Sequence, residues 1–202
     1  MVRIKGMDMR DISAGILVGG KSTRMGENKA FLRAGDTNFL GRALAVCEGF
    51  SSVVISVGIP GPYKSIGTEL VCDEKSGSGP LEGLYNLLRN SPSEYVFIMA
   101  VDMPLLTADF LEALAGCVDS EADCYIVRSC GRVHPLCGVY SRRVVPEIER
   151  MRENDERKIR LLLDRVKTRY LDIEDMGFDE VILSNVNSPG EYDKLKEDGL
   201  LD

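Results

Sequence analysis

The residues with the clearest chemistry lie in a glycine-rich, basic segment near the N-terminus, LVGGKSTRMGENKAFL. Gly19 and Gly20 carry no side chain, so their backbone N–H groups can approach phosphate oxygens closely. Lys21, Arg24 and Lys29 add positive charge to the same segment. The guanidinium of Arg24 can bond two phosphate oxygens at once, whereas Lys29 acts as a point charge. The segment therefore predicts a site for a phosphorylated ligand, with a solvated basic loop as the alternative.

Two aspartates that follow apolar segments indicate a metal or nucleotide site. Asp102 follows Tyr95–Val101, in which every residue is apolar, and a proline two residues later prevents the strand from continuing. A carboxylate there suits Mg²⁺, which binds one or two carboxylates together with substrate phosphates. The alternative role, capping the next helix, is already served by Thr107. Asp73 could bond a base, a ribose or a metal-bound water, or it could simply form a turn.

The N-terminal segment also matches the G-x-x-x-x-G-K-[ST] phosphate loop of P-loop NTPases, from Gly15 to Ser22. In a true P-loop the first glycine follows a strand, and the Lys-Ser pair begins a helix. Here Gly15 falls inside the apolar segment Ile12–Val18, and Gly26 and Asn28 continue the loop. We therefore favour another class of nucleotide-binding protein. A P-loop ATPase that hydrolyses ATP without an acceptor remains the alternative.

Two further candidates lie later in the chain. GSGPLEGL, which includes Gly79, is a second glycine loop before a helix, and the N–H groups at a helix N-terminus attract anions. His134, the one histidine in the sequence, precedes a proline and a strand, so substrate contact and a structural role are both open. With a single histidine and no G-x-S-x-G segment, a Ser-His-Asp acyl-transfer site has little support.

Strands and helices alternate through the first two-thirds of the chain. Apolar periodicity predicts strands at 12–18, 53–57, 70–72, 95–101, 124–127, 136–140, 169–173 and 180–183, and helices at 39–47, 81–88, 107–117, 143–151, 158–166 and from 189. This order predicts an α/β fold with a three-layer arrangement around a mostly parallel central sheet. Ligands of such sheets bind beyond the carboxyl ends of the strands. The glycine loop, Ser56, Asp73 and Asp102 all follow or end strands at that edge.

Size and charge limit the possible classes of protein. A length of 202 residues favours one domain over residues 1–202, with 1–11 as a short extension before the first strand. The net charge of −7 argues against a nucleic-acid-binding surface or an anionic membrane surface. No apolar run approaches the ~20 residues of a membrane helix, and the N-terminus lacks the apolar region of a signal peptide. We therefore expect a cytoplasmic protein.

The cysteines offer a second function class. Cys124, Cys130, His134 and Cys137 have side chains of the types that zinc prefers, so a zinc-binding module is a further alternative. Their spacing lacks a C-x₂-C pair, and they are spread over two predicted strands. Most of the cysteines fall in apolar runs, where a free cysteine behaves as a small buried hydrophobe. Disulfides are not expected in a cytoplasmic chain.

Taken together, these segments resemble the molybdenum cofactor guanylyltransferases, within the larger group of nucleotide-sugar-type NTP transferases with a Rossmann-like fold. LVGGKSTRMGENK resembles the L-A-G-G-x-S-x-R-M-G-x-x-K signature, with Val18 in place of alanine. GPLEG resembles G-P-L-A-G, with Glu82 in the alanine position. VDMP, HPLCGVY, the basic stretch Arg157–Arg160 and NVNSPGEY resemble later blocks. Many nucleotidyltransferases share the first signature. Its combination with HPL and N-V-N-[ST]-P narrows the resemblance to the molybdenum cofactor guanylyltransferases.

The resemblance implies a role for each matching residue. Asp102 would bind Mg²⁺ and GTP, and Arg24 and Lys29 would stabilise charge on the phosphates. Ser56 stands where relatives often carry asparagine, which puts that contact in doubt. The other implied GTP contacts are Leu17, Val18, Gly19, Gly20, Lys29, Asp73 and the loop residue Gly79. His134, Asn185 and Asn187 would lie near the acceptor.

The implied reaction transfers GMP from GTP to molybdopterin and releases pyrophosphate. Positioning and electrostatics supply most of the catalysis in such transfers, and no protein nucleophile is needed. A relative that uses CTP, or one with a sugar phosphate or other phosphate acceptor, is the closest alternative. Glu82 adds negative charge beside the expected nucleotide site and could alter substrate preference. Contacts with other proteins of molybdenum cofactor biosynthesis are a further expectation.

Overall fold

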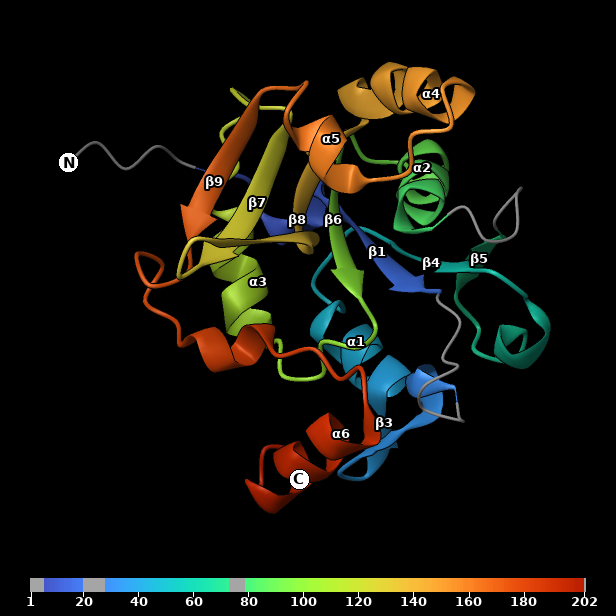
Figure 1. Ribbon diagram of the computed structural model, residues 1–202, viewed down its shortest axis with the longest axis vertical. Helices are drawn as coiled ribbons and strands as arrows, with labels where there is room; N and C mark the ends of the chain where they lie inside the picture. The colour runs from blue at the N-terminus through green and yellow to red at the C-terminus, as the bar shows by residue number, and fades with distance from the viewer. Residues whose placement is uncertain (1–5, 20–27, 73–78, 202) are drawn as a thin grey trace.

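A seven-stranded sheet forms the centre of the computed structural model, which describes residues 6–19, 28–72 and 79–201 (Figure 1). The strands lie in the order β5-β4-β1-β6-β8-β7-β9. Their bounds are β1 Ser13–Val18, β4 Val53–Val57, β5 Glu69–Cys72, β6 Tyr95–Ala100, β7 Cys124–Ser129, β8 Arg132–Ser141 and β9 Thr168–Asp172. A separate pair, β2 Arg33–Ala34 and β3 Thr37–Asn38, forms a small antiparallel hairpin.

The sheet is mostly parallel. β1 pairs in parallel with both β4 and β6, β4 with β5, and β7 with β9. β8 runs antiparallel to its two neighbours, β6 and β7. Because β8 is reversed, its first residues lie at the edge where the parallel strands have their carboxyl ends. The predicted fold class is therefore confirmed.

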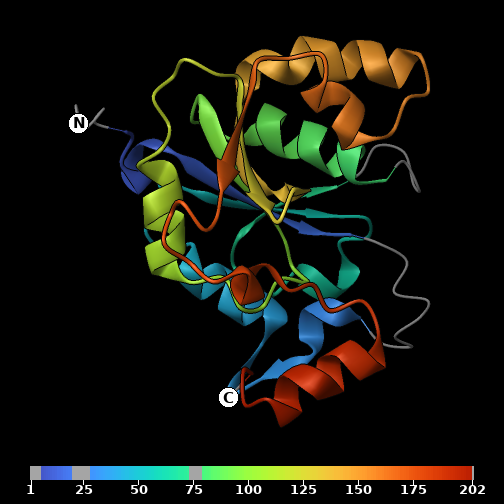
Figure 2. The same cartoon turned by 60° about the vertical axis from the view of Figure 1, so that its left-hand side comes forward.

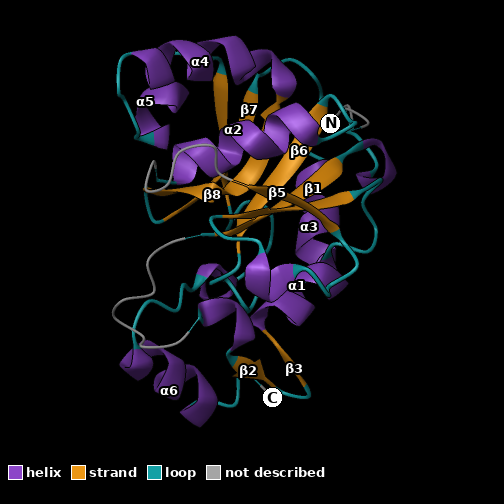
Figure 3. Ribbon diagram, turned by 90° about the vertical axis from the view of Figure 1, so that its right-hand side faces the viewer, coloured by secondary structure: helices purple, strands orange, loops and turns teal. Residues whose placement is uncertain are grey.

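Helices cover both faces of the sheet and complete three layers. α2, α4 and α5 pack on one face, and α1 and α3 cover the other (Figure 3). The C-terminal helix α6, red in Figure 2, lies beside the β2–β3 hairpin. The helices are α1 Phe39–Val46, α2 Pro80–Asn90, α3 Ala108–Ala115, α4 Val145–Glu153, α5 Ile159–Leu163 and α6 Pro189–Glu197. Among the described residues, the helices are all too short or too polar to span a membrane.

The sequence accounts for most of these elements. β1 and β6 are buried at every residue, as expected for central strands that helices cover on both faces. Gly15 lies inside β1, where an added Cβ would fall 2.8 Å from Leu87 and 2.9 Å from Ile98. Its place within the strand is inconsistent with the first glycine of a P-loop. Thr107 caps α3 as predicted, because its side chain accepts a hydrogen bond from the Phe110 N–H.

One predicted element was wrong, and another was missed. Residues 180–183 form a 3₁₀ turn instead of a strand, because the Asp179 carboxylate accepts a hydrogen bond from the Val181 N–H and starts the turn. The β2–β3 hairpin was not predicted, since its strands are too short to show alternation. In the segment expected to be an extension, Met7 donates its N–H to the Val118 carbonyl, which ties the described residues of that segment to the end of α3.

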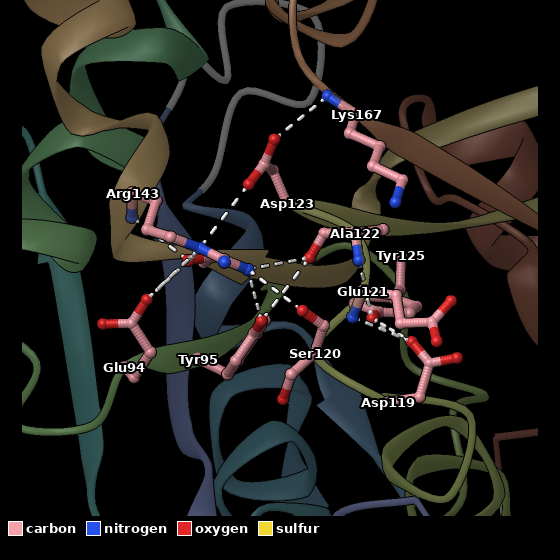
Figure 4. A network of polar contacts seen from close by, with 11 residues as sticks. Glu94, Tyr95, Asp119, Ser120, Glu121, Ala122, Asp123, Tyr125, Arg143 and Lys167 are labelled. Atoms are coloured by element: carbon pink, nitrogen blue, oxygen red, sulfur yellow. Dashed lines mark hydrogen bonds and ion pairs between the residues drawn. The ribbon is translucent and has the colours of Figure 1, made fainter. Parts of the chain in front are cut away.

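At the amino-terminal edge of β6, far from the expected ligand edge, one arginine connects three segments (Figure 4). Arg143 follows β8 and donates to the Tyr95 hydroxyl at 2.6 Å and to the Ala122 carbonyl at 3.2 Å. It also lies 3.5 Å from the Asp123 carboxylate and 3.6 Å from that of Glu94. These contacts join the starts of β6 and β7 to the end of β8, which fixes the antiparallel strand between its neighbours.

Candidate active site

Asp102 lies just beyond β6, beside the end of β1. Leu17 of β1 is in register with Ala100 of β6. The Val101 N–H continues this pairing by donating to the Leu17 carbonyl at 3.0 Å. The chain then turns away at Asp102, so that its partly buried carboxylate lies at the ligand edge of the sheet. This is the place that the order of strands predicts for a metal or phosphate site.

The Lys29 ammonium group contacts Asp102 directly. Lys29 Nζ lies 3.1 Å from Asp102 Oδ2, and the two side chains are only 17% and 18% exposed. Nζ also donates to Asn187 Oδ1 at 2.7 Å. A lysine inside such a half-buried cluster loses side-chain entropy that a solvated basic loop would keep. Lys29 is therefore held in a partly buried cluster and not in a solvated loop, and its binding of phosphate remains a prediction.

The NVNSP segment supplies the other side of this cluster. Asn185 Nδ2 donates to Asp102 Oδ1 at 3.0 Å, although the two residues are 83 positions apart in sequence. The Val186 N–H donates to the backbone carbonyl of Asp102 at 2.9 Å. Both carboxylate oxygens of Asp102 are thus bonded, one to an amide and one to an ammonium. The resemblance assigns Asn185 and Asn187 to acceptor binding. In the structure, Asn185 contacts Asp102, the residue expected to bind metal, and Asn187 contacts Lys29, the residue expected to bind phosphate.

One polar residue of this cluster was not predicted. Glu191, in the first turn of α6, accepts a hydrogen bond from the Asn187 N–H at 2.6 Å. The spacing Ser188-x-x-Glu191 is the sequence signal that could have revealed it, because it matches a helix capping box.

The residues predicted to contact the nucleotide at the ends of β1 and β4 differ in their exposure to solvent. Gly19 is exposed at the end of β1, whereas Leu17 and Val18 are buried strand residues that could bind through the backbone. Ser56 is 2% exposed and faces α2, since a Cβ on Gly83 would fall 3.0 Å from its hydroxyl. Its contact with a nucleotide remains a prediction.

Several predicted residues lie elsewhere or outside the described ranges. Gly79 immediately precedes α2 with a φ of +77°, a backbone conformation that glycine adopts without strain. Gly20, Lys21, Arg24 and Asp73 lie outside the described residues, and their roles remain predictions.

Glu82 does not add charge to the nucleotide side, contrary to expectation. Its carboxylate is 2% exposed and accepts two hydrogen bonds from the Arg152 guanidinium, at 2.9 and 2.8 Å. The same guanidinium lies 3.9 Å from the centre of the Tyr85 ring. The pair joins α2 to α4. Glu82 therefore has a packing role, with its charge compensated locally.

His134 lies at the first, ligand-edge end of β8 and is partly buried. Burial and the nearby Arg132 lower the pKa of its imidazole, although Glu180 acts in the opposite direction. The imidazole is therefore neutral near pH 7, when it can donate one hydrogen bond and accept another. The described contacts do not connect His134 to Asp102 or Lys29.

The structure separates the four residues of the zinc alternative. Cys137 and Cys124 are both fully buried, but they belong to the hydrophobic clusters on opposite faces of the sheet. Burial raises the pKa of both thiols, which disfavours the thiolate that zinc binds. Cys130 is exposed in the β7–β8 turn beside Glu174. One zinc ion cannot contact these side chains together.

The donor set around Asp102 fits a hard divalent cation. Mg²⁺ takes oxygen ligands and usually combines one or two carboxylates with substrate phosphates and water. The Asp102 carboxylate meets the protein part of that requirement, and the Lys29 ammonium beside it can bind phosphate. The cluster therefore contains side chains of the types that bind a nucleoside triphosphate and its metal, and such binding remains a prediction.

Comparison with known proteins identifies the family. A family model described as the MobA-like NTP transferase domain matches residues 14–170. The chain belongs to this family. The predicted resemblance is thereby confirmed, and so is the broad class, a nucleotidyltransferase.

Relatives named as molybdenum cofactor guanylyltransferases match nearly the whole chain. A probable molybdenum cofactor guanylyltransferase of Carboxydothermus hydrogenoformans is 31% identical over 190 residues, covering 93% of this chain and 96% of the relative. The molybdenum cofactor guanylyltransferase of Campylobacter jejuni is 29% identical, covering 95% and 99%.

Solved structures support the same fold. Molybdopterin-guanine dinucleotide biosynthesis protein A from Archaeoglobus fulgidus superposes with a TM-score of 0.81 at 23% identity, covering 93% of this chain and 98% of that chain. A 2-C-methyl-D-erythritol 4-phosphate cytidylyltransferase from Thermus thermophilus reaches 0.68 at 13% identity, covering 92% and 97%. At these identities the likeness concerns the fold alone.

Proposed function

We propose that this MobA-like protein is a metal-dependent guanylyltransferase that transfers GMP from GTP to molybdopterin. The names of relatives that match over 90% of the chain support this substrate pair. The single observation that carries the proposal is the cluster of Lys29, Asp102, Asn185 and Asn187 at the ligand edge of the sheet. It joins a cation that we expect to bind phosphate to a carboxylate that we expect to bind metal.

In the proposed reaction, a terminal phosphate oxygen of molybdopterin attacks the α-phosphorus of GTP. The new O–P bond forms as the bond from the α-phosphorus to the bridging oxygen of the β-phosphate breaks, and pyrophosphate leaves with that oxygen. The acceptor phosphate is already an anion, so no protein base is required to activate it. Lys29, together with Arg24 from the glycine segment, stabilises negative charge on the transferring and leaving phosphates.

Asp102 is the proposed ligand of Mg²⁺. The bound metal would neutralise charge on the triphosphate oxygens during transfer. Asn185 holds one oxygen of the Asp102 carboxylate at 3.0 Å, which fixes the direction of the other. A ligand held in this way loses less entropy when the metal binds.

The acceptor is proposed to bind on the side of the cluster that faces β8. His134 lies at the end of that strand, and its neutral imidazole can donate a hydrogen bond to a pterin or phosphate oxygen. Asn185 and Asn187 would contact the acceptor only in addition to their bonds with Asp102 and Lys29. We further propose that the reaction takes place in the cytoplasm, and that proteins of molybdenum cofactor biosynthesis deliver or receive the acceptor.

Mass spectrometry of the product tests this proposal. The protein would be incubated with molybdopterin, Mg²⁺ and an equal mixture of GTP and CTP. The proposal predicts a product in which GMP is joined to the acceptor through a pyrophosphate linkage. A CMP conjugate would keep the reaction type and change the nucleotide. Absence of any conjugate, with wild-type protein that binds GTP, would contradict transfer to this acceptor.

A further inference from the structure

A chain of hydrogen bonds leads from the start of α6 to the Lys29 ammonium. The Glu191 carboxylate accepts a bond from the Asn187 N–H at 2.6 Å. The side-chain oxygen of the same asparagine accepts a bond from Lys29 Nζ at 2.7 Å, and Nζ lies 3.1 Å from Asp102 Oδ2. In the described part of the chain, Glu191 is not hydrogen-bonded to Lys29 or Asp102, so it can act on them only through residue 187 and through its charge.

We propose that Glu191 is a positioning residue that fixes the Lys29 ammonium for phosphate binding. The inference rests on the proposed function, which assigns Lys29 to the phosphates of GTP. By holding the backbone of residue 187, the Glu191 carboxylate fixes the point from which the Asn187 amide oxygen reaches Lys29. The ammonium is then held between two oxygens, one from Asn187 and one from Asp102.

Glu191 is itself well anchored. Its own N–H donates to the Ser188 hydroxyl at 3.3 Å, as in a capping box. The bond from the Asn187 N–H, assisted by Ser188 and by the charge of Lys29, holds the pKa of Glu191 below its usual range. The carboxylate is therefore ionised at neutral pH and accepts a charge-assisted bond, which is stronger than a neutral one.

The helix that carries Glu191 is docked on the N-terminal part of the chain. The Tyr192 hydroxyl donates to the Arg33 carbonyl at 2.9 Å, and its ring meets the Phe39 ring edge-on at 6.0 Å. Leu195 on the same helix is buried in the core. Lys29 belongs to the 3₁₀ turn that leads into this region. Glu191 therefore has a rigid base from which to position residue 187.

Glu191 has a second role, helix capping, which must be separated from positioning. A capping-box glutamate bonds backbone N–H groups at the start of its helix, and its loss destabilises that helix. Ser188→Ala is the matched control, because it removes the other half of the box and leaves the bond between Glu191 and Asn187 possible. Both substitutions weaken the cap, but only the Glu191 substitution releases residue 187.

Steady-state kinetics of GMP transfer separate the two roles. We expect Glu191→Ala to lower kcat about tenfold and to change the KM for GTP by less than about threefold. The displaced Lys29 ammonium can still bind the phosphates of GTP, but it no longer lies where it stabilises charge during transfer. Ser188→Ala should keep kcat within about twofold. Glu191→Gln retains an acceptor oxygen and should recover part of the loss. If Glu191→Ala does not fold, Glu191→Gln replaces it, and its kcat should still fall below that of Ser188→Ala, because a neutral acceptor holds the Asn187 N–H less strongly.

A double-mutant cycle and one spectroscopic signal complete the test. In an Asn187→Ala background, Glu191→Ala should lower kcat by less than about twofold further. The hydrogen bond between residue 187 and Lys29 is already absent there, so Glu191 can no longer act on Lys29 through it. The ¹³Cε NMR signal of Lys29 should shift in Glu191→Ala and stay in place in Ser188→Ala. Full additivity in the cycle, or equal kcat values for the Glu191 and Ser188 variants, would overturn the positioning role.

The NMR signal also distinguishes the two possible failures. If the wild-type protein transfers no nucleotide, the proposed function fails, and the Lys29 signal still decides the positioning role. If the wild type is active while the Lys29 signal is the same in all variants, the positioning role fails and the proposed function stands.

Discussion

The Lys29 ammonium lies 3.1 Å from the Asp102 carboxylate. The side chain expected to bind phosphate and the side chain expected to bind metal are therefore bonded to each other. When a metal–nucleotide complex binds, the phosphates can take over the ammonium and the metal can take over the carboxylate. The ion pair thus compensates two opposite charges at the position where we propose that both ligands bind.

This relationship predicts that Lys29 opposes metal binding to the free protein. Lys29→Met removes the positive charge beside Asp102 and frees one carboxylate oxygen. We expect the variant to bind Mn²⁺ several-fold more tightly than the wild type in the absence of nucleotide, and GTP more weakly. Water proton relaxation in Mn²⁺ titrations measures the first effect, and calorimetry with GTP the second. Equal Mn²⁺ affinity in both proteins would show that the ion pair does not compete with the metal.

Asp102→Ala is expected to abolish transfer. The substitution removes the proposed metal ligand and leaves Lys29 and Asn185 without their shared partner. We expect a loss of about 10²–10³ in kcat/KM, the scale of a group that stabilises charge in the transition state. Asp102→Asn is the matched control for shape, and it should be nearly as inactive. Retention of wild-type activity by either variant, measured with saturating Mg²⁺, would remove Asp102 from the mechanism.

The buried pair of Glu82 and Arg152 is expected to affect stability without affecting nucleotide choice. Glu82→Ala removes the carboxylate that accepts two hydrogen bonds from the Arg152 guanidinium, but Arg152 is 18% exposed and can partly reach water. We therefore expect the free energy of unfolding to fall by about 2–3 kcal/mol, less than the ~3–5 kcal/mol for a fully buried pair. Urea unfolding measures this change.

Two controls define this prediction. The double variant Glu82→Ala/Arg152→Met should recover part of the stability, because it removes both charges. Arg10→Ala, which breaks the exposed pair with Asp8, should have little effect. A changed ratio of GTP to CTP use in a folded Glu82→Gln variant would restore the original expectation for this residue.

Asp119 is expected to make the free energy of unfolding depend on pH in the acidic range. Although burial alone would raise its pKa, hydrogen bonds from Tyr125 and Arg169 lower it from 3.8 to about 2. A depressed pKa in the folded state means that the stabilisation is present above 3.8 and is lost as the pH falls toward about 2. Asp119→Asn should therefore be less stable than the wild type near neutral pH. The gap between the two proteins should close as the pH falls through that range.

Urea unfolding of both proteins at several pH values measures this dependence. Arg169 also lies 3.5 Å from Glu121, so the variant keeps one partner for the arginine. A stability difference that stays constant down to about pH 2 would contradict the assigned interaction.

Much of the fold followed from local pattern. The apolar segments that became β1, β4 and β6 were predicted almost to their ends, because central parallel strands are buried on both faces. The turn at 180–183 was mistaken for a strand, since a four-residue segment with three apolar side chains is compatible with either a short strand or a 3₁₀ turn. What decided between them was one hydrogen bond from the Val181 N–H to the Asp179 side chain.

The candidate site was predictable only in part. Asp102 could be placed at the ligand edge, because it directly follows a strand. Its partner Asn185 could not, since the two lie 83 residues apart and no local rule brings them together. Glu82 was misread for a related reason. Residues 81–88 of α2 are buried on all sides, so sequence spacing cannot tell which of them face the sheet and which face α4.

The measurement that tests the central claim most directly is pyrophosphate release from GTP, CTP, ATP and UTP, each with Mg²⁺, in the presence and absence of molybdopterin. The proposed function predicts release from GTP that requires molybdopterin, and little from the other three nucleotides. Release from CTP alone would contradict the guanylyl assignment. Release of inorganic phosphate from ATP without an acceptor would contradict nucleotidyl transfer itself.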